Sequence, residues 1–149
     1  MKAKTVLKTV YILSCISLFL PWFTYNAKMM GYCWGFRFLI WFIVPMAIIG
    51  VFVFAGKRAD SLSVLAELSS AVNIGILVFA FGRWQESSNI IAGFQWKDGF
   101  RTATPGFWIS ALLFIVLFIL VQIASIQERH RNINPNKSAQ QSPVITGEG

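Results

Sequence analysis

The chain has few of the side chains that catalysis and metal binding require. Its 149 residues include one histidine, two cysteines and six acidic residues, and charged residues make up 13% of the total. We find no Ser/His/Asp arrangement, HExxH motif, C-x-x-C pair or glycine-rich phosphate loop in it. The sequence therefore predicts a protein that is not an enzyme and that has no cofactor and no metal site.

The sequence contains several long apolar runs instead. Four of them cover approximately residues 6–24, 38–55, 62–81 and 107–126. Because a helix rises ~1.5 Å per residue, about 20 apolar residues cross the hydrocarbon core of a bilayer, which is ~30 Å thick. The sequence predicts an all-α membrane protein, with residues 1–126 forming a four-transmembrane-helix bundle in contact with the lipid bilayer.

The last part of the chain differs in composition. Residues 127–149 are polar, contain Pro135 and Pro143, and have no aromatic side chain. Such a segment cannot bury enough apolar surface to offset the entropy of ordering it. We expect a disordered cytoplasmic tail from residue 127 onward.

The basic residues predict the orientation of the bundle. Eight lie near the two termini or in the second connection, and five lie in the longer connections on the other side. Basic residues favour the cytoplasmic side, so both termini are expected there, in a multi-pass protein of the cell membrane, and in particular of a bacterial inner membrane. The net charge of +7 is scattered around the apolar runs, so we expect no nucleic acid partner.

Aromatic residues gather on the predicted outer side. All six tryptophans lie on or beside it, and the indole ring prefers a membrane interface. We expect an outer aromatic surface, and the pair Asp98 and Gly99, which favours a two-residue turn, predicts a short β-hairpin in the second outer loop. The residues of this surface are Trp34, Trp84, Phe94, Trp96 and Phe100.

Glu67 is the one acidic residue within an apolar run. An intramembrane carboxylate costs ~2.5–3.5 kcal/mol on insertion scales, so it usually faces the bundle and has a partner. Helical spacing and predicted depth assemble an intramembrane polar cluster around it, with Lys8 or Gln122 as the expected partner. Three interpretations remain open: a polar clasp that fixes helix packing, a side chain that reaches the headgroups, or a proton or cation site. The cluster consists of Glu67, Asn73, Ser70, Gln122 and Lys8.

These features predict a protein that acts by contacts with other proteins. The partner would be another membrane protein or a second copy of the chain, in an accessory, assembly or immunity-type role. The alternative is a small transporter or channel subunit that uses Glu67 and Asn73.

Overall fold

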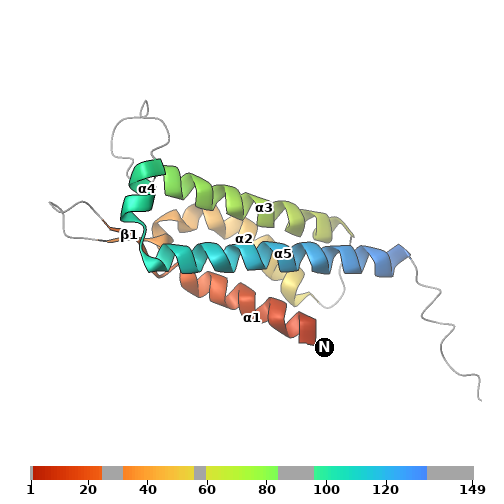
Figure 1. The fold of residues 1–149 in the computed structure, drawn as a ribbon. Helices are drawn as coiled ribbons and strands as arrows, with labels where there is room; N and C mark the ends of the chain where they lie inside the picture. Colours follow the sequence, from red (N-terminus) through yellow and green to blue (C-terminus); the bar gives the residue numbers. More distant parts are fainter. Residues whose placement is uncertain (1, 25–31, 56–59, 84–95, 134–149) are drawn as a thin grey trace, which may run out of the picture.

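The computed structural model describes residues 2–24, 32–55, 60–83 and 96–133, and most of these residues lie in helices (Figure 1). Two short strands and a 3₁₀ helix complete the described part of the chain. In order, the elements are α1 (Lys2–Ser17), β1 (Pro21–Thr24), β2 (Tyr32–Trp34), the 3₁₀ helix η1 (Gly35–Phe38), α2 (Leu39–Phe54), α3 (Asp60–Arg83), α4 (Trp96–Thr102) and α5 (Pro105–Ile133).

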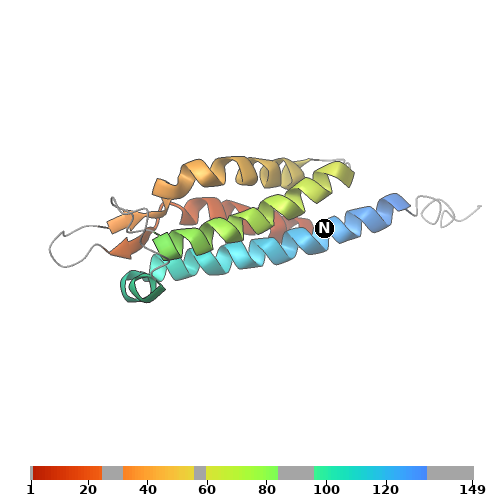
Figure 2. The same ribbon diagram turned by 90° about the horizontal axis from the view of Figure 1, so that it is seen from above.

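Helices α1, α2, α3 and α5 run roughly along one axis (Figures 1 and 2). Helix α3 packs against both α2 and α5, and α1 packs against α5 and α2. The strands and the short helix α4 lie together at one end of the bundle, which we call the strand end. The N-terminus of α1 and the C-terminus of α5 lie toward the opposite end.

Two of the helices are long and apolar enough to cross a membrane. These are Asp60–Gly82 within α3, with a mean hydropathy of 1.9, and Pro105–His130 within α5, with 2.8. Only 28% of the most apolar stretch of α5 is buried inside the protein, so many of its apolar side chains are exposed or partly exposed. This pattern supports association with a membrane, because an aqueous solvent disfavours so much exposed apolar surface.

The first helix ends earlier than the apolar run predicts. Helix α1 stops at Ser17, and residues 18–20 form tight turns in which Leu20 N–H donates to the carbonyl of Ser17 (3.1 Å). Pro21 explains the stop, since proline has no N–H to donate and its ring pushes the preceding residue out of the helical region. Residues 21–24, predicted as the end of a span, form strand β1 instead.

A two-stranded antiparallel hairpin is present, but not where the sequence predicted it. Strand β1 pairs with β2, with Phe23 opposite Cys33 and Thr24 opposite Tyr32. Asp98 and Gly99 lie inside helix α4, so the turn predicted there is wrong. Gly99 does not have a positive φ; instead, a Cβ atom there would lie 2.6 Å from the carbonyl oxygen of Phe81. This glycine allows α4 to approach α3 closely.

The last helix extends beyond the predicted span. Helix α5 continues to Ile133, so residues 127–133 are helical and the predicted tail cannot begin at residue 127. Glutamine, glutamate and arginine in this stretch are good helix formers and extend a helix that is already nucleated. Residues 134–149 lie outside the described part of the chain.

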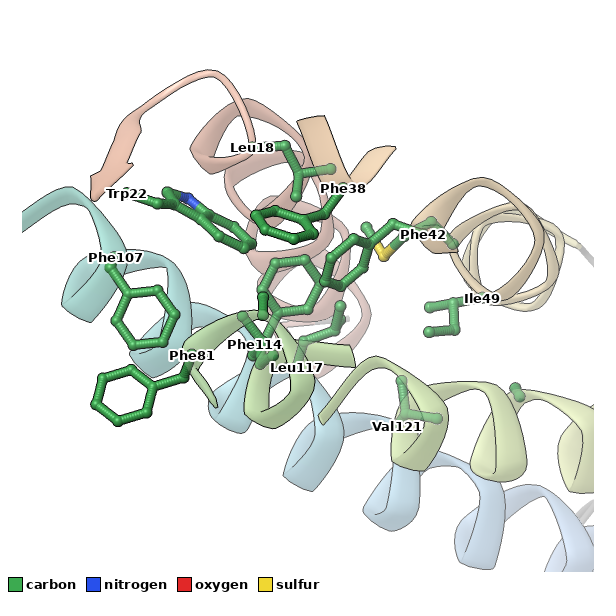
Figure 3. Packing of buried hydrophobic residues seen from close by; sticks show 14 of the residues in the cluster. Leu18, Trp22, Phe38, Phe42, Ile49, Phe81, Phe107, Phe114, Leu117 and Val121 are labelled. Carbon is green, nitrogen blue, oxygen red and sulfur yellow. The ribbon is translucent and has the colours of Figure 1, made fainter. Parts of the chain in front are cut away.

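Three buried aromatic side chains pack directly against Trp22, which is itself fully buried (Figure 3). Its ring stacks on Phe38 of η1, with centroids 5.8 Å apart, and meets Phe42 of α2 and Phe107 of α5 edge to face. The indole Nε1 donates to the hydroxyl oxygen of Ser110 (3.0 Å) and lies 3.3 Å from the carbonyl oxygen of Ser17. Trp22 thus joins the end of α1 to α2 and α5.

We predict that Ser110→Ala lowers the free energy of unfolding by about 1–3 kcal/mol, because the buried indole N–H loses its better acceptor. Thr9→Ala is the matched control, since Thr9 is an exposed helical hydroxyl that donates to the carbonyl of Thr5. Denaturant unfolding in mild detergent measures both variants. Equal losses in the two would contradict this role of the indole hydrogen bond.

Candidate functional site

The polar residues of α3 and α5 recur at helical spacing. Ser63, Ser70 and Asn73 of α3 are buried, as is Ser125 of α5. Residues three or four apart share one side of a helix, and α3 and α5 pack against each other. We call this set the polar seam: Ser63, Glu67, Ser70 and Asn73 from α3, with Gln122, Ser125 and Arg129 from α5.

The charged pair of the polar seam is Glu67 with Arg129. The guanidinium Nη2 of Arg129 donates to Oε1 of Glu67, with the Glu67 side chain 18% exposed and that of Arg129 40% exposed. Each charge is thereby compensated at the end of the bundle opposite the strands. The sequence interpretation missed Arg129 because it assigned residue 129 to a disordered tail, whereas α5 carries this residue as part of a continuous helix.

The two partners that the sequence proposed for Glu67 contact other side chains. Lys8 is exposed on α1, and its ammonium group lies 5.2 Å from the ring centroid of Phe54. Gln122 does belong to the polar seam, but its Nε2 donates to Oγ of Ser70 (3.4 Å). The structure therefore brings Glu67, Ser70 and Gln122 together and leaves Lys8 apart from them.

Hydrogen bonds link neighbouring members of the polar seam. The hydroxyl of Ser70 donates to the backbone carbonyl of Glu67 (2.7 Å), one turn earlier in α3. The side-chain amide of Asn73 donates to the sulfur of Met46 in α2 (3.3 Å). Asn73 thus connects α3 to α2, while Ser70 and Glu67 connect α3 to α5.

Three buried oxygen atoms of the polar seam have no hydrogen-bond partner within the described residues. They are Oγ of Ser63, Oδ1 of Asn73 and Oγ of Ser125. A buried polar atom without a partner costs about 1–3 kcal/mol, so these three oxygen atoms lower the stability of the polar seam.

The predicted outer aromatic surface is described only in part. Trp34 in β2 is 42% exposed and Phe100 in α4 is 65% exposed. Trp96 begins α4, but its side chain lies outside the described part of the structure, as do residues Trp84 and Phe94. The structure adds Trp41 and Trp108, both exposed, near the same end of the bundle.

Two grooves open at the strand end. One lies between α3, α4 and α5 and is lined only by apolar residues, including Leu77, Phe81 and Phe100. The other lies between β1 and the start of α5 and includes Thr24 and Arg101. Neither groove is lined by a residue of the polar seam.

Comparison with known proteins assigns no relative. No protein-family model, curated protein or solved structure matches the chain.

A double-mutant cycle tests the charged pair. We expect Glu67→Gln and Arg129→Gln to be coupled by about 0.5–1 kcal/mol in unfolding free energy, a modest value because Arg129 is partly exposed and screened. The control cycle combines Glu67→Gln with Lys8→Gln, which should be additive because Lys8 lies over Phe54. Additivity in the first cycle, or coupling in the control, would contradict the pairing.

Proposed function

We propose that the chain is a four-helix membrane bundle with both termini in the cytoplasm. Helices α1 and α2 lie alongside α3 and α5 (Figures 1 and 2), and apolar residues on their outward faces are exposed, such as Ile16 in α1 and Val44 in α2. Helix α2 is 16 residues long, or ~24 Å, and the preceding η1 lengthens it toward the ~30 Å of a hydrocarbon core. The excess of basic residues supports the orientation.

A topology reporter tests this arrangement. A fusion partner that is active only in the cytoplasm, joined after Gly149, should be active. The control is the same partner inserted between β1 and β2, on the predicted outer side, where it should be inactive. Activity at the inserted position, or inactivity after Gly149, would overturn the orientation.

Within this arrangement, we propose that the protein acts by contacts with another membrane protein or with its own copies, and not by catalysis. The observation that carries the proposal is the contrast between the two ends of the bundle. The charge of Glu67 is already compensated by Arg129, whereas exposed aromatic side chains lie at the strand end, next to the buried cluster around Trp22. Tryptophan is enriched where interfaces gain most of their binding energy.

In-cell photocrosslinking tests the contact role. A photoreactive phenylalanine analogue in place of the exposed Trp34 should give discrete crosslinked products in native membranes. The matched control replaces Ile119, an exposed residue in the middle of α5, which should meet lipid only. A product of twice the chain's mass would identify self-association. No product from Trp34, or the same products from Ile119, would contradict the role.

The transporter or channel alternative rests on the unpartnered buried oxygen of Asn73. A permeating cation or proton would use this oxygen together with Glu67. The alternative predicts that Glu67→Gln abolishes activity and leaves the fold intact. The contact role predicts that the crosslinks from Trp34 survive the same substitution.

A further inference from the structure

The groove between β1 and the start of α5 combines a charged side chain with apolar walls. Its volume is about 590 Å³, within the range of about 300–1,000 Å³ that is typical of sites for small ligands. Leu20, Pro21 and Ile109 are among its apolar lining residues, and Arg101 lines it from the end of α4. The basic group and the apolar walls therefore belong to one groove.

The threonine hydroxyls at this groove already donate hydrogen bonds inside the protein. The hydroxyl of Thr24 donates to the carbonyl of Thr102 (3.2 Å), and that of Thr104 donates to the carbonyl of Trp22 (3.2 Å). Arg101 is exposed and is the one charged side chain among the described residues that line the groove. Because its guanidinium carries a permanent charge and five N–H donors, the groove favours a ligand with negatively charged oxygen atoms.

The groove lies at one end of a membrane-capable helix. Pro105 and Gly106, which begin the apolar stretch Pro105–His130 of α5, both line it. Arg101 lies four residues before that stretch, where β1 is in contact with both α4 and α5 (Figure 1). In a membrane-inserted bundle, the groove is therefore at the level where the hydrocarbon core meets the lipid headgroups.

An apolar face of α5 continues from the groove along the bundle. Ile109 lines the groove and is exposed, and Leu112 is exposed three residues later on the same side of the helix. Val116 follows one turn further and is partly buried. Because Arg101 and Ile109 line the same groove, the positive charge is adjacent to this apolar face.

We propose that this groove binds an anionic phospholipid, with the lipid phosphate at Arg101 and one acyl chain against Ile109 and Leu112. The proposal rests on the proposed insertion into a membrane but not on the contact role. An arginine fork matches a phosphate in both charge and donor geometry. A phospholipid carries this phosphate next to an apolar chain, which is the order in which Arg101, Ile109 and Leu112 follow one another toward the bundle.

Lipid titration of the purified full-length chain tests the charged part of the site. The delipidated protein in mild detergent receives phosphatidylglycerol or phosphatidylcholine with identical chains, and native mass spectrometry counts the bound lipids. We expect one tightly bound phosphatidylglycerol and weaker phosphatidylcholine. Arg101→Gln should reduce this preference about fivefold, the contribution of one basic residue beside an anionic lipid. Arg101→Lys, which keeps the charge, should retain most of the preference.

Lys97→Gln is the matched control for the charge. Lys97 is exposed on the same helix but does not line the groove. Solvent screens an exposed charge that does not touch the ligand, so this variant should change the preference by less than about twofold. An equal loss in Lys97→Gln and Arg101→Gln would show a general attraction to α4 and would contradict a site in the groove.

A second pair of variants tests the groove itself. Ala103→Leu places extra methyl groups in it and should abolish the tight binding of both lipids. Ala111→Leu is the control, because Ala111 is also partly buried but lines the separate groove between α3, α4 and α5. If Ala103→Leu does not fold, Ile109→Ala removes an exposed part of the apolar wall and should weaken the binding of both lipids severalfold.

Three further results would overturn the proposal. They are equal binding of the two lipids by the unmodified chain, a preference unaffected by Arg101→Gln, and a protein dimer, in place of a bound lipid, that disappears in Ala103→Leu. The topology reporters and the Trp34 crosslinks are independent of lipid binding. Failure here therefore leaves the proposed function standing, and failure of those experiments is visible separately.

Discussion

The hydrogen bond from the Trp22 indole to Ser110 is the constraint on which the strand end depends. A fully buried indole N–H requires an acceptor, and Ser110 supplies it while its own hydroxyl lies 3.1 Å from the carbonyl of Ser17. The tryptophan ring leaves no room for a side chain at Gly35, and a Cβ atom at Gly106 would overlap the carbonyl of Pro21. Two glycines and one serine, far apart in sequence, therefore fix how α1, η1 and α5 meet.

Backbone contacts then extend this junction to the remaining segments. Gly35 N–H donates to the carbonyl of Leu20 (3.0 Å), which anchors the start of η1 to the end of α1. Thr104 N–H donates to the carbonyl of Trp22 (2.9 Å), and the hydroxyl of Thr24 donates to the carbonyl of Thr102 (3.2 Å). Helix α4 is held between these bonds and Phe81, so the apolar groove between α3, α4 and α5 depends on the same junction as the exposed aromatic side chains.

The pattern of apolar residues predicted the long apolar helices, and α3 and α5 agree with that prediction. It could not locate the hairpin. The pair Asp98 and Gly99 has the composition of a turn, but its glycine serves the close contact with Phe81, which depends on tertiary packing. Trp22 likewise has the sequence context of an interfacial anchor, but tertiary contacts with Phe38, Phe107 and the distant acceptor Ser110 bury it. The sequence features that could have indicated the burial of Trp22 were the adjoining Pro21 and the glycines at positions 35 and 106.

The position of Arg129 shows why composition alone did not predict the structure of residues 127–133. Residues 127–133 are as polar as a disordered tail, yet they continue a helix whose apolar part is held by α1 and α3. The arginine reaches back to Glu67 only if this helix is unbroken, and the carboxylate is inexpensive within an apolar segment only if the arginine reaches it. The extension of α5 and the burial of the Glu67 charge therefore stabilise each other. Neither the sequence around residue 67 nor that around residue 129 predicts this coupling by itself.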